Sequence, residues 1–315
     1  MKKTKIWILG EKSKKTDFNF YTDSKINQIA DEMNIELKLI SPGKIDLIVS
    51  KEDIKNIMYD GNAIEVPDCV ITRIGTITYY SLAIIRQLEK LGVFVLNSSH
   101  SIEIAKDKLF TLQLLSANNI PVPKTMLVKF PFNIALIERE FSYPVIVKTI
   151  TGSGGKGVFL AENRNRLIGL INRFASQEES KNNLILQEFI SASRGKDIRV
   201  IVIGGRAIGA IMRRASDGNF KANYSAGGLV DPYIINPTVE WLAVESSKII
   251  GLDIAGVDIL FDKENYKVCE VNSYPGFAGF EKVTDINVSR EIFKYILEYQ
   301  EKKNNTTVKN TENLP

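Results

Sequence analysis

Oxygen-bearing side chains near the end of the chain have the spacing of a cation site. Glu270 and Asn272 are two residues apart in the strand-like run YKVCEVN, so both side chains belong to one face of that strand. Asp258 lies in the preceding strand-like run, AGVDILF, and a hairpin loop of three or five residues would place it directly opposite Glu270. Converging carboxylates repel each other unless a cation lies between them, and oxygen ligands favour a hard ion. We therefore expect Mg²⁺ here; the other interpretation is the exposed polar face of an antiparallel sheet.

A glycine-rich stretch, TGSGGKGV, supplies the residue types that surround phosphate groups. Gly152, Gly154 and Gly157 spell G-x-G-x-x-G, but strand-like residues follow them, whereas a dinucleotide fingerprint must open a helix. The Walker A pattern also fails, because Gly155 and Lys156 are followed by glycine rather than Ser or Thr. The flanking strands predict a hairpin whose amides can close over phosphates, as in kinases, although no kinase catalytic motif follows. A flexible hairpin without a ligand is the alternative.

Cationic side chains at strand ends complete the set of candidates. Lys148 follows the apolar run PVIV, where a charge is costly unless it meets an anion or water. Arg199 comes two residues after Asp197, and Arg213 ends the next strand-like run. Arginines near acidic metal ligands suit a negatively charged intermediate. A lysine reaching solvent and ordinary surface salt bridges are the simpler interpretations.

The composition limits the classes of function. The 315 residues are 44% hydrophobic and 25% charged, with a net charge of +4, which suits a globular enzyme of two or three domains and an anionic ligand rather than nucleic acid. No apolar run is long enough for a signal peptide or a membrane span, so we expect no membrane association. Two cysteines predict a reducing, cytoplasmic location, and a single histidine disfavours a Ser-His-Asp triad.

Alternating strand and helix signals predict a small open α/β domain over residues 1–97. Its strands are expected at 5–10, 46–50, 69–74 and 93–97, with helices at 23–34 and 79–92. Downstream, the patterns predict a helix over 102–125, ending at two prolines, a short helix near 133–140, and helices over 164–175, 239–250 and 288–301. Strands are expected around 124–130, 143–150, 157–163 and 183–190, and hairpins over 197–213 and 255–272. The polar segment 302–315 is expected to be a disordered tail.

The order of these motifs resembles that of the ATP-grasp carboxylate–amine ligases. Lys148, TGSGGKGV, LILQEFI, GKDIRVIVIGG, MRRA, GNFKANYSAGG, AGVDIL and CEVNSYPGFAGFEKVT follow one another as in that family, and most closely as in its RimK-type group, which adds glutamate to a carboxylate end. The resemblance covers roughly residues 66–300, and ITRIG at 71–75 resembles an Arg-Ile-Gly motif of the group near the active site. It implies an α/β and α+β chain: a Rossmann-like pre-ATP-grasp domain (1–97), a central grasp subdomain with the glycine-rich lid (98–187) and a C-terminal grasp subdomain with the metal site (188–301).

The resemblance also implies a role for each candidate residue. ATP phosphates would be held by Lys108, Lys148 and a lid formed by Gly152, Ser153, Gly154, Gly155, Lys156 and Gly157, and adenine by the hinge Gln187, Glu188, Phe189 and Ile190. Asp197 would face the ribose, Lys221 would lie near the nucleotide, and Asp258, Glu270 and Asn272 would bind metal. Arg199, Arg213 and Asn223 would act near the transferred phosphate. The chain departs from the group at Lys221, where arginine is usual, and at Ser225 and Ala226, where histidine and arginine are common, so the resemblance says least about the amino acid and its acceptor.

The implied reaction is ADP-forming ligation through an acyl phosphate, with ATP and two Mg²⁺ ions, or Mn²⁺ in their place. The partners would be an amino acid, with glutamate first, and a carboxylate acceptor that is a peptide, a protein C-terminus or a metabolite. A homodimer or homotetramer is expected by analogy. A kinase-type phosphotransferase and a non-catalytic nucleotide-binding regulator remain alternatives, and no residue is an evident general base.

Overall fold

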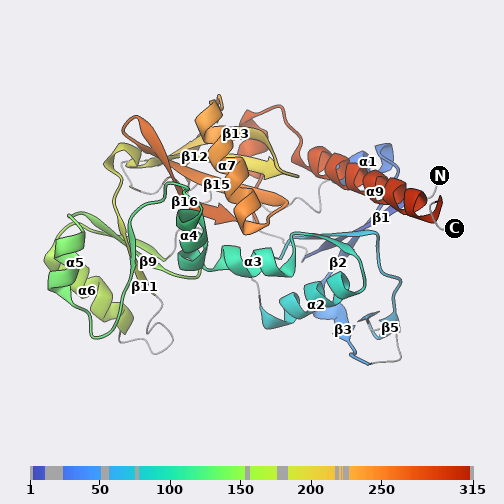
Figure 1. Cartoon of the computed structure of the whole chain (residues 1–315), viewed down its shortest axis with the longest axis horizontal. Coiled ribbons are helices and arrows are strands. Elements are labelled where there is room, and N and C mark those ends of the chain that lie inside the picture. The colour runs from blue at the N-terminus through green and yellow to red at the C-terminus, as the bar shows by residue number, and fades with distance from the viewer. Residues whose placement is uncertain are drawn as a thin grey trace.

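The structure, a computed structural model, describes residues 3–10, 24–50, 57–74, 78–152, 157–175, 184–216, 220, 222 and 227–312. Three lobes lie in a row (Figure 1). The N-terminal domain is at one end, a five-stranded sheet with its helices lies in the middle, and a small four-stranded lobe lies at the other end. The arrangement confirms the predicted mixture of a small α/β domain and a larger α+β region.

The N-terminal domain is built on a parallel sheet of order β2-β1-β6-β7. Its strands are Thr4–Leu9 (β1), Ile35–Ile40 (β2), Cys69–Thr72 (β6) and Phe94–Leu96 (β7), and its helices are Ser24–Glu32 (α1) and Tyr79–Lys90 (α2). The prediction of 46–50 as a strand of this sheet is wrong. Its place is taken by β2, which alternates polar and apolar residues at the sheet edge and therefore lacks a buried-strand signal.

Residues 45–63 form a separate small antiparallel sheet instead. After a 3₁₀ turn at Pro42–Lys44, Ile45–Leu47 (β3) pairs with Ile57–Tyr59 (β4), which pairs with Asn62–Ala63 (β5). Ile48 and Val49, which belong to the strand expected at 46–50, are 50% and 85% exposed because β3 ends before them.

The predicted helix over 102–125 is two helices, Ser99–Lys106 (α3) and Lys108–Ala117 (α4). Asp107 separates them: its extended backbone ends α3, and its side chain accepts a hydrogen bond from the amide of Phe110, which caps α4. The apolar repeat continues through the break, which explains the error. Lys108 is thereby the first residue of α4, and both helices contact α7 and β16 of the middle lobe.

The small lobe is an antiparallel sheet of order β10-β9-β11-β8 with two helices. The strands are Thr125–Leu127 (β8), Val145–Thr149 (β9), Val158–Ala161 (β10) and Leu184–Glu188 (β11), and the helices are Ile134–Glu140 (α5) and Arg164–Ala175 (α6). The strands β9 and β10 are the predicted pair on either side of the glycine-rich stretch.

The middle lobe contains a five-stranded antiparallel sheet of order β14-β13-β12-β15-β16, covered by Pro237–Ile250 (α7). Its strands are Lys196–Ile203 (β12), Arg206–Arg214 (β13), Leu229–Tyr233 (β14), Ile254–Asp262 (β15) and Asn265–Asn272 (β16). The strand β14 was not predicted. The β12–β13 hairpin turns at Gly204 and Gly205, both with positive φ.

The predicted pairing of Asp258 with Glu270 is confirmed, but by a different route. The β15–β16 turn has two residues rather than three or five, which alone would place Asp258 opposite Cys269. A register shift between Asp258 and Ile259 adds the missing residue, and Asp258 then faces Glu270.

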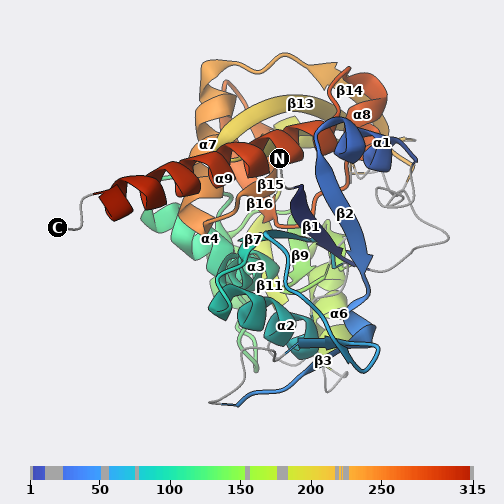
Figure 2. The same cartoon turned by 90° about the vertical axis from the view of Figure 1, so that its right-hand side faces the viewer.

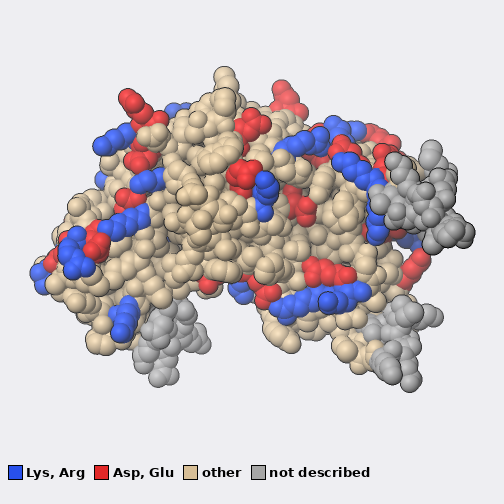
Figure 3. All heavy atoms as spheres, viewed as in Figure 1, with Lys and Arg blue, Asp and Glu red and all other residues tan. Residues whose placement is uncertain are grey.

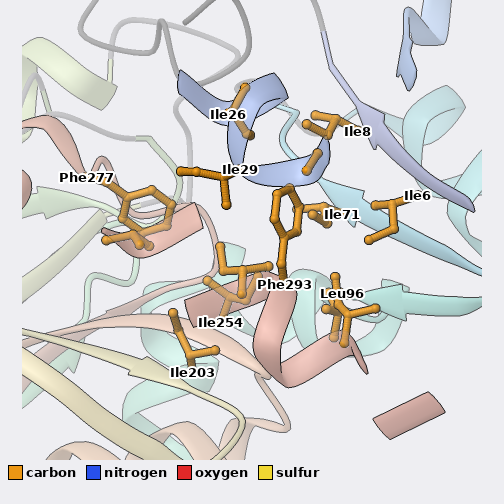
Figure 4. Close-up of a cluster of buried hydrophobic side chains, with 14 of the residues drawn as sticks. Ile6, Ile8, Ile26, Ile29, Ile71, Leu96, Ile203, Ile254, Phe277 and Phe293 are labelled. Atoms are coloured by element: carbon orange, nitrogen blue, oxygen red, sulfur yellow. The ribbon is translucent and has the colours of Figure 1, made fainter. Parts of the chain in front are cut away.

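The last helices join the lobes. Ala278–Val283 (α8) and Val288–Glu312 (α9) contribute Phe280, Phe293 and Ile296 to a core shared by the parallel sheet and the middle sheet. Figure 4 shows Phe293 between Ile71 of the first and Ile254 of the second. The helix α9 runs on to Glu312 beside the N-terminal domain (Figures 1 and 2), so residues 302–312 are helical and not the expected disordered tail. A helix nucleated by packed residues extends at little further cost into the polar sequence that follows.

Two surface properties follow from the described residues. None of their helices combines the length and the apolar character needed to cross a membrane. On the face drawn in Figure 3, basic and acidic side chains are interspersed.

Candidate active site

A buried carboxylate held by two arginines lies at the centre of the five-stranded sheet. Asp258 in β15 is hydrogen-bonded by both Nε and Nη2 of Arg199 on the neighbouring strand β12, the latter at 2.7 Å. Arg213 in β13 reaches the same carboxylate, with Nη2 3.0 Å from Oδ2, and also forms a two-point pair with Asp197 at 2.6 and 2.8 Å. The register explains the arrangement, because Arg199 pairs with Asp258 and Asp197 with Arg213 across adjacent strands.

The two acids of this network differ in their electrostatics. Burial alone raises the pKa of Asp258, but Arg199 and Arg213 outweigh it and hold the pKa below its usual value. Asp197 is paired with Arg213, but burial and the nearby Asp258 carboxylate outweigh Arg213 and Arg199, so its pKa is raised. Burial lowers the pKa of Arg213, yet Asp258 and Asp197 together raise it well above the usual range.

The predicted metal ligands lie together. Asn272 pairs with Gly256 across the hairpin, and its amide nitrogen donates to the Gly256 carbonyl at 3.2 Å and to Asp258 Oδ2 at 3.4 Å. This leaves the amide oxygen of Asn272 as the atom for a cation. Glu270 is directly opposite Asp258, with its side chain 30% exposed. Two carboxylates and one amide oxygen fit a hard cation, although the described residues contain no group of three or more His, Cys, Asp or Glu side chains that could hold a metal ion.

Lysines cross between the two sheets. Lys108, at the start of α4, lies 3.5 Å from Glu270 Oε1 and donates to the carbonyl of Gly152 at 2.7 Å. Lys148 in β9 donates to Gln187 Oε1 at 2.6 Å and lies 3.4 Å from Cys269 Sγ on β16. These contacts join the two sheets where four cationic side chains and three carboxylates lie in linked pairs or neighbouring register positions: Lys108, Lys148, Arg199, Arg213, Asp197, Asp258 and Glu270.

The predicted hinge lies at the end of β11. Glu188 accepts hydrogen bonds at Oε1 from the Lys124 amide at 2.8 Å and from Lys267 of β16 at 2.6 Å, so this carboxylate joins the two sheets. The carboxamide of Gln187 likewise accepts a hydrogen bond from Lys148 and donates one to Thr125 Oγ1. Phe189 and Ile190 follow directly, and Ile190 is buried.

Both ends of the predicted lid are close to Thr149. The Thr149 amide donates to the Gly157 carbonyl at 3.0 Å, and its Oγ1 donates to the Thr151 carbonyl at 2.7 Å. A β-carbon at position 157 would lie 2.1 Å from Thr149 Oγ1, and Gly152 has φ of +125°. The remaining candidates in this region and in the later loop lie outside the described residues: Ser153, Gly154, Gly155, Lys156, Lys221 and Asn223, together with Ser225 and Ala226.

Several residues of the site were missed from the sequence. Cys269 lines a small hollow together with Lys108 and Glu270, but it was interpreted as a strand residue only. Burial raises the pKa of its thiol. Lys267 was also missed: burial lowers its pKa, but Glu188 and Asp262 outweigh this and raise it. Strict alternation along β16 would place Lys267 and Cys269 on the face opposite Glu270 and Asn272, and the register shift within the hairpin, which changes this, has no evident signal in the sequence.

Comparison with solved structures supports the class that fold and site define. The ATP-grasp ligase PsnB, complexed with a phosphomimetic variant of minimal precursor, Mg and ADP, superimposes with a TM-score of 0.71 at 20% identity, covering 93% of this chain and 97% of PsnB. D-alanine–D-alanine ligase from Bacillus anthracis complexed with ATP gives 0.68 at 18% identity, covering 95% and 99%. The fold is the ATP-grasp fold, and the chain is an ATP-grasp ligase, an enzyme that forms carbon–nitrogen bonds.

Sequence comparison identifies the family. The RimK pre-ATP-grasp domain matches residues 4–102, and the RimK-like ATP-grasp domain matches residues 105–296. A protein of Legionella pneumophila (strain Corby) named probable alpha-L-glutamate ligase is 37% identical over 285 residues, which cover 89% of this chain and 93% of the relative. The chain therefore belongs to the RimK-like ATP-grasp family, as the resemblance indicated.

Proposed function

We propose that this protein joins the amine of an amino acid, glutamate first, to a carboxylate of a peptide, a protein C-terminus or a small molecule, with ATP converted to ADP and phosphate. The observation that carries the proposal is the buried Arg199–Asp258–Arg213 pairing opposite Glu270 and beside Asn272, in a strand whose Glu270 and Cys269 are reached by Lys108 and Lys148. The name of the Legionella relative supports glutamate, and the PsnB complex with a precursor supports a peptide acceptor.

The proposed chemistry proceeds through an acyl phosphate. A carboxylate oxygen of the acceptor attacks the γ-phosphorus, and ADP leaves. The amine nitrogen then attacks the acyl carbon, the C–O bond to phosphate breaks, the amine loses a proton, and inorganic phosphate departs with one oxygen of the original carboxylate. Positioning and charge neutralisation are the main demands of such a transfer.

The residues of the site meet these demands in distinct ways. Lys108 and Lys148 would hold the phosphates. Arg199 and Arg213 are fixed by their pairing with Asp258, and they would stabilise the negative charge that develops on the acyl phosphate. The arginines also keep Asp258 ionised, as the lowered pKa of that acid indicates. The Glu188 side chain is occupied by Lys124 and Lys267, so this position would serve the nucleotide through its backbone.

Asp258, Glu270 and Asn272 are proposed to hold two Mg²⁺ ions, which Mn²⁺ could replace. When bound, the ions supply Lewis-acid neutralisation of the β- and γ-phosphate oxygens. Two divalent ions would also balance the four negative charges of ATP. The resulting neutral complex matches a site with nearly equal numbers of acidic and basic side chains. By family analogy we further propose a homodimer or homotetramer and keep the predicted domain limits at 97/98 and 187/188.

The test is the release of ADP and phosphate in the presence of a panel of amino acids, with glutamate-ended peptides or small dicarboxylates as acceptors. We expect glutamate to stimulate phosphate release and the product mass to rise by that of one amino-acid residue. If no amine stimulates release across the panel, the ligase proposal fails. Phosphate transfer to the acceptor without amine dependence would favour the kinase alternative, and nucleotide binding without turnover would favour the regulator.

A further inference from the structure

Two buried side chains of the N-terminal domain reach the loop that follows the metal-ligand strand. Arg73, just after β6, donates from Nη1 to the Pro275 carbonyl at 3.0 Å. Asn97, just after β7, donates from Nδ2 to the Ser273 carbonyl at 2.9 Å. Both residues lie at the carboxyl edge of the parallel sheet, and they are 3% and 1% exposed. We call Arg73 and Asn97 the carbonyl clamp.

The Asn97 side chain forms hydrogen bonds with the start of β15 and with the residue that follows β16, at the same end of the hairpin. Its Nδ2 also donates to the Ile254 carbonyl at 2.8 Å, and its Oδ1 accepts from the Ile254 amide at 2.8 Å. The Asn97 amide is itself fixed by Thr72 Oγ1 at 2.8 Å. Since Ile254 starts β15 and Ser273 directly follows Asn272, one carboxamide fixes the end of the hairpin that carries the amide ligand.

Arg73 is fixed with similar strictness. Its amide donates to the Leu9 carbonyl at 2.9 Å, and its guanidinium lies over the rings of Tyr274 and Phe277 at 4.0 and 4.5 Å. These rings flank Pro275 in the chain, so one side chain of the first domain contacts the loop at three points. Figure 4 shows Phe277 on the same side of the shared core as Ile254.

The loop after β16 in turn lies against residues of the active site. A β-carbon on Gly256 would lie 2.7 Å from Pro275 Cβ and 3.2 Å from Arg199 Cδ, so Pro275 and Arg199 both come close to this glycine and leave no room for a side chain. The Gly256 carbonyl also accepts a hydrogen bond from the side-chain amide of Asn272. Neighbouring residues therefore link Arg73, through Pro275 and Gly256, to Arg199, which pairs with Asp258.

We propose that Arg73 and Asn97 are positioning residues of the active site, which set the place of Asn272 and Arg199 from the N-terminal domain so that Asp258, Glu270 and Asn272 can bind the metal of a metal–nucleotide complex. The metal part of this inference rests on the proposed function. The placement of the loop does not, and it can be measured without any ligand.

The test compares the full-length wild type with Arg73→Met, Arg73→Lys and Asn97→Ala. Arg290→Met is the matched control, because Arg290 joins α9 to Glu32 of the N-terminal domain, an ion pair on other elements than the clamp. Hydrogen–deuterium exchange of the segment 271–277 is measured without ligand, and the affinity for ADP is measured in EDTA and in excess Mg²⁺.

We expect Arg73→Met and Asn97→Ala to speed exchange of this segment at least tenfold and to reduce the Mg²⁺-dependent tightening of ADP at least fivefold, with the affinity in EDTA changed less than twofold. Arg73→Lys should fall between them and the wild type, and Arg290→Met should match the wild type. Arg73→Lys also serves where Asn97→Ala does not fold. Wild-type exchange and a wild-type Mg²⁺ response in folded Arg73 variants overturn the inference. If Mg²⁺ does not change the affinity of the wild type for ADP, the proposed metal site is contradicted instead. The hydrogen–deuterium exchange is measured without ligand, so it still tests the placement of the loop.

Discussion

On the five-stranded wall of the site, Asp197 and Asp258 are paired with arginines, whereas on the four-stranded wall Lys148 contacts a neutral amide and a thiol. The paired charges sit on central strands whose registers place them opposite one another. Lys148 of β9 instead reaches Cys269 of the five-stranded sheet, and Lys108 of α4 reaches the Gly152 carbonyl that follows β9 in the chain.

The difference separates two tasks. A network of buried paired charges keeps its geometry without a ligand, because moving one charge away would leave its partner buried and unpaired, which is costly. A lysine that contacts neutral atoms can exchange them for phosphate oxygens at lower cost. We infer that the five-stranded wall is preorganised for the reacting groups, while the four-stranded wall adapts to the nucleotide. Four predictions test this division.

The largest effect is expected for Asp258→Asn. Both arginines would lose their shared carboxylate, so we expect turnover to fall by roughly 10³-fold and the free energy of unfolding to fall by roughly 3–5 kcal/mol. Glu270→Gln should cost similar turnover with little stability, because Glu270 is 30% exposed and its ion pair with Lys108 is long, at 3.5 Å. Phosphate release and urea unfolding measure the two quantities. Equal stability losses in both variants would contradict a preorganised network around Asp258.

Lys148→Met should weaken ATP binding by roughly 10²-fold, the cost of removing one buried charged partner. The stability should change little, since Lys148 has no carboxylate partner among the contacts described above. Lys124→Met is the matched control in the same lobe, where the lysine is paired with Glu140 at the surface and is 51% exposed. Calorimetric titration with a non-hydrolysable ATP analogue gives the affinities. A Lys148 variant that unfolds easily but binds normally would reverse the roles of the two walls.

Gly157→Ala should lower turnover about tenfold, because the added methyl group meets Thr149 Oγ1 at the base of the lid. The double variant with Thr149→Ala should recover much of this loss, since the nearest atom is removed. The same change at Gly169 in α6, where a β-carbon meets nothing within 4 Å, should leave turnover unchanged and stabilise the protein by about 1 kcal/mol. Additive losses in the double variant would show that the contact with Thr149 is not the cause.

The smallest effect concerns an acid just before β15, compared with Asp258 within that strand. Asp253 is half-buried, and burial raises its pKa although the Tyr295 hydroxyl donates to it at 2.6 Å. An acid whose pKa is raised by folding loses stability as pH rises through the folded pKa. Asp253→Asn should therefore raise the melting temperature at pH 7 and have little effect near pH 3, where the wild-type acid is protonated. The pKa of Asp258 is lowered, so its contribution is present at pH 7 and is lost only as pH falls below the usual value of an aspartate. A lower melting temperature for Asp253→Asn at pH 7 would contradict the assignment.

Local patterns in the sequence predicted the parts of the site that depend on strand alternation. Glu270 and Asn272 share a face because side chains alternate, and the hairpin placed Asp258 opposite Glu270 even though the turn length was wrong. The bulge that corrected the register has no evident signal in the sequence. The break at Asp107 did have one, a capping aspartate, but the apolar repeat on both sides of it concealed the helix start that carries Lys108.

Contacts between distant segments could not be predicted in this way. Arg73 and Pro275 are 202 residues apart, and Asn97 and Ser273 are 176 apart. Their meeting depends on how α9 packs the parallel sheet onto the middle sheet, which is a property of the assembled core. The pairing of Lys267 with Glu188 is similar, because it requires two different sheets to face each other.

The acyl-phosphate route is tested most directly by following one oxygen atom. An acceptor with ¹⁸O in its carboxylate is incubated with ATP, Mg²⁺, glutamate and the enzyme, and the released phosphate is examined by mass spectrometry. We expect one ¹⁸O in each phosphate, because the acceptor oxygen attacks the γ-phosphorus and leaves with it when the amine displaces phosphate. Unlabelled phosphate formed together with the amide product would contradict the acyl-phosphate route.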